Sequence, residues 1–308
     1  MEKQLRHIAS SIMRLAMALL IVPLLSGCAK MAIGDEDEPA GDGDYTIRFS
    51  VSDYTMTDFD NSPSATKSMR RERKEARQLG SILNFAVFKD GEKVVKVNQK
   101  SDDDGFGTIS ANLSEGTYQV VVLIHSCSGN ATISSPEKIT FPDNKVTDTF
   151  AYCSDLTVNG NSECPITVER IVAKFRMTLA DAIPDNVTQL QFAYTGGSST
   201  LDATTLLGCV NSRQKEIRTV VDHAAGQVFE IYSFPKSENN GLNLTVTAMD
   251  ASGKTVKANE YANVPIEKNK ITTYTGKFFT ESAGEEMEGD AHIVIGGDDA
   301  WEEEIEYQ

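Results

Sequence analysis

Apolar and polar residues alternate with a period of two along most of the chain, and this feature restricts the fold most. In the segment 45–51, every second side chain is apolar. In the segment 171–179, the odd positions are all apolar, and Lys174, Arg176 and Thr178 fall between them. Successive side chains of a β-strand point to opposite faces of a sheet. The pattern therefore predicts strands with one buried face and one solvated face.

Other segments have the same strand character, and no long amphipathic helix is indicated. Asp90-Gly91 predicts a tight hairpin, because this pair tolerates the positive φ angles of such a turn. We expect Asp102–Gly105 to form a second hairpin turn, because an EF-hand would need oxygen ligands where Lys100 and Ala111 stand. The remaining predicted strands are 85–88, 94–97, 119–124, 138–141, 146–152, 189–194, 227–234, 242–248 and 270–279.

The strand spacing predicts an all-β protein with two antiparallel β-sandwich domains in tandem. At about 150 residues per domain, 308 residues are enough for two. We expect one sandwich at 45–165 and the other at 166–280, each long enough to bury its own core. An acidic tail, 281–308, follows them.

The first 27 residues have the features of a secretory signal peptide. Basic residues precede an apolar run at 15–25, which is too short to cross ~30 Å of hydrocarbon as a helix. The run ends in Leu25-Ser26-Gly27-Cys28, the order of residues in a bacterial lipobox. We expect cleavage before Cys28 and acylation of its thiol, which would anchor the protein to a membrane. A buried cysteine behind an ordinary signal peptide is the alternative.

Residues 28–44 are rich in charge and poor in bulky apolar groups, which predicts a solvated, acidic tether. The acidic run 35–38 lies close behind Cys28. It resembles the export tags of surface lipoproteins in Bacteroides-like bacteria, although a plain linker has the same composition.

The charge of the chain argues against nucleic-acid binding. The formal net charge is −16, whereas neutralisation of phosphates needs a basic surface. We find no dinucleotide-binding, P-loop, zinc-protease or nucleophile-elbow motif, so we expect neither an enzyme nor a cofactor nor a metal site. His125 follows a predicted strand, and we expect it to pack in the core or at its rim.

Four cysteines follow the lipobox, and three pairings of them are compatible with an exported protein. Cys153 with Cys164 is the most local pair, whereas free, buried thiols are the alternative. The remaining two are Cys127 and Cys209.

Charged residues concentrate in two segments. Residues 67–77 hold six basic groups, and we expect a solvated loop that a trypsin-like protease could cut at Arg70, Arg71, Arg73 or Arg77. A helical turn or an ordinary surface loop is the alternative. Residues 281–308 hold eleven acidic groups and no Lys or Arg. Within this tail, His292-Ile293-Val294-Ile295 and the only tryptophan, Trp301, predict a strand that pairs with its own domain or with another chain.

The sequence resembles the fimbrillin family of Bacteroidales bacteria, which are lipoprotein subunits and anchors of pili. The stretches that carry the resemblance follow one another in a matching order, and those beyond the signal segment lie between residues 45 and 280. They are the lipobox ending at Cys28, the turn 113–118, the segment 169–175, Tyr232-Ser233-Phe234-Pro235, and the segment 264–274.

The resemblance implies two transthyretin-like, Greek-key sandwiches and a role in fimbria assembly and cell adhesion at the outer membrane. In this family a protease can remove the first strand after an arginine, and a neighbouring subunit's C-terminal strand fills the groove. Here the first strand would be 45–51, the cut would lie among Arg70–Arg77, and the donor would be about 291–301. Its partners would be other fimbrial subunits and a host or bacterial surface ligand.

A surface glycan-binding lipoprotein is the alternative function. Such a protein usually presents exposed aromatic side chains, and Tyr194, Tyr232 and Tyr261 are the candidates. The sequence leaves open whether a pilus subunit would lie in the shaft, at the tip or at the anchor.

Overall fold

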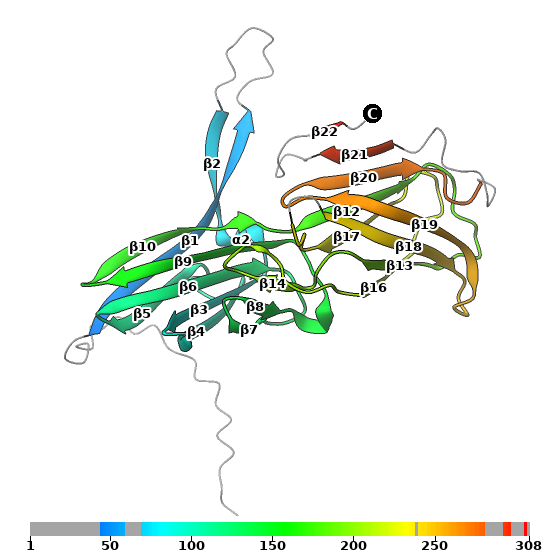
Figure 1. The fold of residues 1–308 in the computed structure, drawn as a ribbon. Coiled ribbons are helices and arrows are strands. Elements are labelled where there is room, and N and C mark those ends of the chain that lie inside the picture. Colours follow the sequence, from blue (N-terminus) through cyan, green and yellow to red (C-terminus); the bar gives the residue numbers. More distant parts are fainter. Residues whose placement is uncertain (1–43, 59–68, 238–239, 281–291, 297–304, 307–308) are drawn as a thin grey trace, which may run out of the picture. The chain divides into compact units, whose positions relative to one another are not determined.

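The computed structural model describes residues 44–58, 69–237, 240–280, 292–296 and 305–306. Residues 40–308 belong to one compact unit. Among the described residues nearly all regular structure is strand, as the alternation predicts, and one short helix interrupts it (Figure 1).

The strands follow one another along the chain in two groups. The first group is β1 (Asp44–Asp58), β2 (Met69–Glu75), β3 (Ile82–Lys89), β4 (Glu92–Lys100), β5 (Thr108–Ser114), β6 (Gly116–His125), β7 (Thr132–Ser135), β8 (Lys138–Thr140), β9 (Thr149–Val158), β10 (Ser162–Thr167) and β11 (Glu169–Arg170). The second group is β12 (Ala173–Leu179), β13 (Gln189–Thr195), β14 (Thr200–Asp202), β15 (Leu207–Gly208), β16 (Gln214–Thr219), β17 (Val228–Ser233), β18 (Asn240–Met249), β19 (Thr255–Ile266), β20 (Ile271–Gly276), β21 (His292–Gly296) and β22 (Ile305–Glu306). The helix α2 (Ala76–Leu79) and the 3-10 turn η1 (Pro142–Asn144) lie among the first group.

The first sandwich consists of two sheets. Sheet A has the order β10-β1-β2, with β5 also paired to β1, and sheet B has the order β11-β9-β6-β3-β4. Alternate side chains of β1, β5 and β10 meet those of β3, β6 and β9 in one buried cluster. Phe49 and Phe85 contact each other across this core, with ring centroids 4.8 Å apart.

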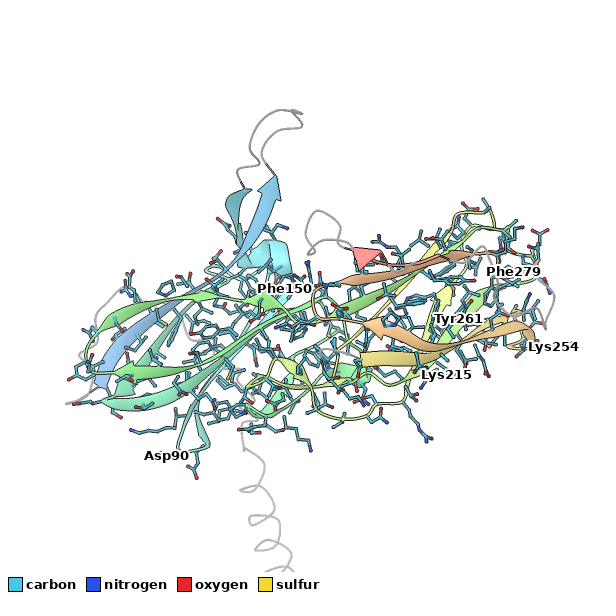
Figure 2. All side chains as sticks on the ribbon, turned by 45° about the horizontal axis from the view of Figure 1, so that its top comes forward. Asp90, Phe150, Lys215, Lys254, Tyr261 and Phe279 are labelled. Carbon is cyan, nitrogen blue, oxygen red and sulfur yellow. The ribbon has the colours of Figure 1, made fainter. Side chains whose placement is uncertain are left out.

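The second sandwich is built in the same way. Sheet D has the order β17-β12-β20-β21-β22, and sheet E has the order β16-β13-β18-β19. The odd positions Phe175, Met177 and Leu179 of β12 face this core, as the sequence pattern predicts. Side chains fill the space between the sheets, including Tyr261, which Figure 2 labels.

A small sheet covers the outer face of sheet B. Sheet C has the order β15-β14-β8-β7 and therefore pairs strands from both halves of the chain. Beneath it, a third cluster includes Phe88 and Leu123 from sheet B and Leu201 and Phe234 from the second half. Because both faces of sheet B are covered, β3 is buried at seven consecutive positions and carries an almost continuous apolar run.

Two strand pairs depart from the predicted antiparallel arrangement. The pairs β1–β10 and β12–β20 are parallel, whereas all the other described pairs are antiparallel. Strands that are distant in sequence form both pairs, so the local pattern carries no signal of their direction. The boundary that we expected between 165 and 166 falls inside β10, and the division into two domains stays a prediction.

Of the two predicted hairpin turns, one is confirmed and one is wrong. Asp90 and Gly91 have φ angles of 53° and 81°, and they join β3 to β4 in the tight turn that we predicted. The turn containing Asp102–Gly105 instead carries the chain from β4 in sheet B to β5 in sheet A. It is a crossover between sheets, because β5 pairs with β1 and not with β4.

The basic segment 67–77 is not a loop where the structure describes it. Residues 69–75 form β2, and Ala76–Leu79 form α2. The reason is that β1 continues to Asp58, beyond its predicted end at residue 51, and so offers an edge for pairing. The register sets residues 52–58 of β1 opposite residues 69–75 of β2. The two strands form a ribbon that extends from sheet A (Figure 1).

Candidate functional site

The first strand lies in the interior of sheet A and has partners on both sides. Residues 47–52 pair in parallel with β10, and residues 44–50 pair antiparallel with β5. Ile47 and Phe49 are fully buried, and Val51 is 6% exposed. Burial of one such side chain contributes about 1.5–3 kcal/mol. Removal of β1 would therefore open a groove with two unpaired strand edges and an apolar floor.

The four candidate cleavage arginines lie in two different settings. Arg70, Arg71 and Arg73 belong to β2 on the ribbon. Arg77 lies in α2, where its guanidinium donates hydrogen bonds to the carbonyls of Ser101 (2.6 Å) and Asp103 (2.7 Å). Two residues of α2 are buried in the core of the first sandwich. The peptide bond after Arg77 is therefore held at the base of the ribbon, unlike those after the other three.

The predicted donor strand pairs with its own chain. The residues His292, Ile293, Val294 and Ile295 form β21 with Gly296, and β21 pairs antiparallel with β20. This places β21 at the outer side of β20 in sheet D, where β22 follows it. Trp301 lies outside the described residues. Of the two pairings that the sequence allows, with its own domain or with another chain, this structure shows the first.

The segment after β20 is fixed by a buried carboxylate. Asp181 accepts hydrogen bonds from the backbone N–H groups of Phe278 (2.9 Å), Phe279 (2.7 Å) and Thr280 (2.8 Å). Burial alone would raise the pKa of Asp181, but these hydrogen bonds outweigh it and lower the pKa. The predicted strand 270–279 therefore ends at Gly276, because the amides beyond it bind a side chain and not a neighbouring strand.

A polar network closes the second sandwich between its edge strands β16 and β17. The Tyr194 hydroxyl contacts the Glu216 carboxylate (2.7 Å) and the carbonyl oxygen of Tyr232 (3.2 Å). Arg218 donates to that carboxylate (2.7 Å) and to the Glu230 carbonyl (2.7 and 3.1 Å). Burial, with the adjacent carboxylate, raises the pKa of Tyr194 well above its usual value, so it stays a neutral donor. Side chains thus bridge two sheets whose strands do not pair here.

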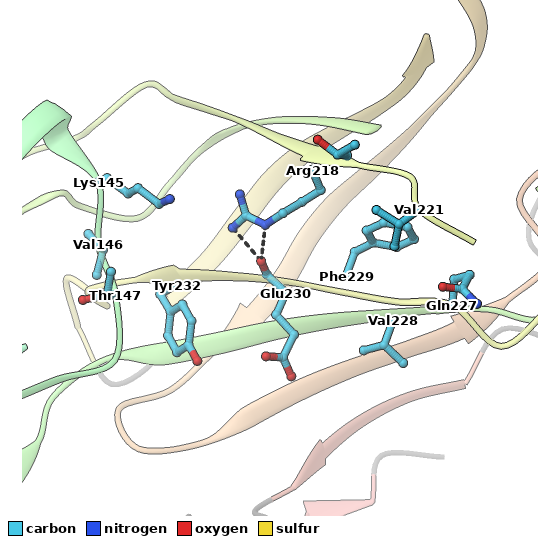
Figure 3. A pocket seen from close by; sticks show the side chains of 11 residues that line it. Lys145, Val146, Thr147, Arg218, Val221, Gln227, Val228, Phe229, Glu230 and Tyr232 are labelled. Atoms are coloured by element: carbon cyan, nitrogen blue, oxygen red, sulfur yellow. Dashed lines mark hydrogen bonds between the residues drawn. The ribbon is translucent and has the colours of Figure 1, made fainter. Parts of the chain in front are cut away.

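A groove of about 720 Å³ runs along this network (Figure 3). Figure 3 shows Arg218 directed at the backbone of Glu230, whose carboxylate points away from it. That carboxylate binds Arg176 (2.7 Å) and Lys174 (3.6 Å). The groove is lined by Lys145, Val146, Thr147, Arg218, Thr219, Val221, Gln227, Val228, Phe229, Glu230 and Tyr232. Sequence reasoning missed this site, because its lining comes from two segments that lie far apart in the chain, 145–147 and 218–232.

Of the alternatives left open for Cys153 and Cys164, a disulfide or free thiols, this structure has free thiols, and all four described cysteines are free. Cys164 packs against the core between sheets A and B, whereas Cys153 packs against the cluster on the other face of sheet B. The sheet therefore separates the two sulfur atoms. Burial, with nearby carboxylates, raises the pKa of the Cys153 thiol to about 11 and disfavours its reactive thiolate.

His125 is a core residue, as we expected. It is fully buried, and burial lowers its pKa to about 4. Its Nε2 lies 2.8 Å from Oδ1 of Asn84, and its Nδ1 accepts a hydrogen bond from the backbone N–H of Cys127. These contacts fit the neutral imidazole, which gives His125 a structural role.

The three tyrosines proposed as a glycan platform do not form one. Tyr194 and Tyr261 are 3% and 4% exposed and belong to the core of the second sandwich. Tyr232 is half-buried, with the Lys174 ammonium 5.5 Å from its ring centroid. Among the described residues, no cluster of His, Cys, Asp or Glu is arranged to hold a metal ion. No helix in the same part of the chain is long and apolar enough to cross a membrane.

The lipobox residues Leu25, Ser26, Gly27 and Cys28 lie outside the described residues, so the lipid anchor stays a prediction. A family model matches residues 44–308, and it is described as a family of unknown function, DUF6562. The chain belongs to this family. Comparison with curated proteins finds no match.

Several solved structures are similar to this DUF6562 chain. A candidate adhesin from Bacteroides ovatus is 13% identical, with a TM-score of 0.49 over 85% of this chain and 95% of its own. The fimbrial anchor protein Mfa2 from Porphyromonas gingivalis is 9% identical, with a TM-score of 0.45 over 82% of this chain and 96% of its own. A fimbrial assembly protein from Parabacteroides distasonis is 13% identical, with a TM-score of 0.38 over 86% and 98%. At these scores the likeness does not by itself assign a function to the chain.

Proposed function

We propose that this protein is a lipid-anchored fimbrial subunit or anchor that acts in cell adhesion and joins other subunits by exchange of β-strands. The observation that carries the proposal is the position of β1 as a buried interior strand directly followed by an arginine-rich strand. A cut in β2 would separate β1 covalently from the rest of the first sandwich. The vacated groove would accept a strand from another subunit, which supplies both backbone hydrogen bonds and alternating side chains.

The C-terminal strand is the donor in this proposal. Among the described residues, β21 pairs with β20 over five residues and with β22 over two, whereas β1 pairs with β2, β5 and β10 over six or seven residues each. Its register against β20 covers five residues, which is a strand length that can move to another sheet edge. Donation from one subunit to the next is heterologous and does not close on itself, so it produces a filament.

The anchoring step rests on the N-terminal sequence. Cys28 follows Leu25-Ser26-Gly27 and would carry the lipid that holds the protein at the outer membrane. The cut would fall after Arg70, Arg71 or Arg73 and not after Arg77. Arg77 lies in α2, where Ala76 and Leu79 are buried, and its guanidinium is hydrogen-bonded to the turn at 101–103. A protease needs an extended, accessible segment in its active site.

Mass spectrometry of protein extracted from the cell surface tests both steps. We expect a lipidated Cys28 on the N-terminal fragment and a new N-terminus after one of the three β2 arginines. Replacement of these three arginines by glutamine should abolish the new N-terminus, whereas the control Lys74→Gln should retain it. An unlipidated Cys28 would refute the anchor, and an intact chain in assembled fimbriae would refute removal of the first strand in this protein.

A further inference from the structure

The groove between β16 and β17 has the properties of a peptide-binding site, independently of how fimbrial subunits join. Two of the large apolar side chains that the described residues expose line this groove: Val221 (88% exposed) and Val228 (52%). Phe229 lines the groove beside them. Apolar side chains gathered at one place, unlike scattered ones, indicate an interaction surface.

The strand β17 offers unused backbone groups at this groove. It ends sheet D, and its pairing with β12 uses alternate residues, such as Gln227, whose carbonyl accepts from Leu179 (2.9 Å). The other alternate residues of β17, which are Val228, Glu230 and Tyr232, direct their backbone N–H and C=O groups away from β12, toward the open edge of sheet D. Side chains occupy two of the three outward carbonyls, those of Glu230 and Tyr232. The N–H and C=O of Val228 have no partner among the described residues.

One residue with both groups free can hold one residue of an extended chain. In an antiparallel pair, two opposite residues exchange both of their N–H···O bonds, so Val228 could bind a partner residue twice. The occupied carbonyls of Glu230 and Tyr232 prevent the pairing from extending along the whole strand. The site therefore fits a short extended segment and does not fit a complete added strand.

The charges that line the groove indicate the charge of the partner. Lys145 and Arg218 line it, whereas its one lining carboxylate, that of Glu230, is bound to Lys174 and Arg176. Arg218 is partly neutralised by Glu216, so Lys145 is the main free cation among the described residues of the lining. In a chain of net charge −16, this groove is a place where an acidic partner is not repelled. We infer that the groove binds a short, extended, acidic–apolar peptide segment of a partner protein, with Val228 pairing to its backbone and Lys145 to a carboxylate.

A fluorescein-labelled peptide of alternating sequence Glu-Val-Glu-Val-Glu-Val-Glu is the probe, and its anisotropy is measured against purified protein. We expect saturable binding that weakens with added salt, and no binding of the Lys-Val-Lys-Val-Lys-Val-Lys peptide. Val228→Pro removes the outward N–H without touching the bonds to β12, and we expect roughly five- to tenfold weaker binding. The variant Val228→Thr keeps the N–H and the branched shape, so it should weaken binding much less than Val228→Pro does.

A charge variant keeps the inference falsifiable if Val228→Pro does not fold. Lys145→Glu should abolish peptide binding, whereas Lys138→Glu, the same charge change on β8 outside the groove lining, should leave it unchanged. Absence of binding by the parent, or equal binding by both lysine variants, would overturn the inference. Self-association of the protein that Lys145→Glu abolishes would also overturn it, because a second copy would then cover the groove.

Discussion

At the scale of single residues, the burial of His125 makes stability depend on pH. The folded protein keeps the ring neutral down to its pKa of about 4, whereas the unfolded chain takes up the proton below about 6.5. The stabilising contribution is therefore complete above pH 6.5 and is lost as the pH falls toward 4. We expect a loss of up to about 3 kcal/mol in the free energy of unfolding.

Urea unfolding at several pH values measures this loss. His125→Gln removes the titrating group, so the stability of the variant should fall less steeply between pH 6.5 and 4 than that of the parent. Other groups, including Asp181, titrate equally in both proteins, so the difference between the two curves isolates His125. Parallel curves would show that His125 does not carry the effect.

Asp181 is the residue on which the end of the second sandwich depends. Asp181→Ala would leave three backbone amides of residues 278–280 without their acceptor, at a cost of about 1–3 kcal/mol. We expect faster proteolysis of the segment after Gly276, detected by mass spectrometry of the fragments. Asp185→Ala, a change of the same kind at an exposed position, should leave the fragment pattern as in the parent.

At the scale of elements, the edge of β17 is protected by side chains and not by a strand. Arg218→Ala would free the Glu230 carbonyl and leave the buried Glu216 carboxylate without its cation. We expect a loss of about 1–3 kcal/mol of stability and more self-association, because an open strand edge pairs with other chains. Sedimentation velocity and denaturant unfolding check this against Arg213→Ala, a change at an exposed arginine directly before β16, the strand that carries Arg218. Equal behaviour of the two variants would contradict the role of Arg218.

The strands that the sequence predicts are those whose inward positions are apolar. β12 is the clearest case, although its Lys174, expected on a solvated face, is 6% exposed and lies against Glu230 and Tyr232. β16 shows the opposite pattern, because Gln214 and Glu216 are buried while Ile217 is 51% exposed. Its inward face is polar because Glu216 binds Tyr194 and Arg218, and the local sequence pattern does not indicate such a pairing. The groove was not predicted for the same reason, because the local pattern does not indicate which side chains meet there.

At the scale of the whole molecule, contacts between distant segments define the candidate site. β1 pairs with β10 more than a hundred residues later, and sheet C pairs β8 with β14. The sequence could indicate that residues 45–51 form a strand, but it could not indicate that this strand lies between two others. The interior position follows only from the register of β1 with β5 and β10. Because of this position, removal of β1 would open the groove that the proposed assembly needs.

Sedimentation velocity of the purified chain after limited cleavage in β2 tests strand exchange most directly. Two proteins are compared, the full chain and a chain that lacks residues 290–308. We predict that the cleaved full chain releases its N-terminal fragment and forms polymers, whereas the cleaved, truncated chain stays a folded monomer. Polymers of equal size from both proteins, or a cleaved full chain that stays monomeric, would contradict strand exchange through the C-terminal segment.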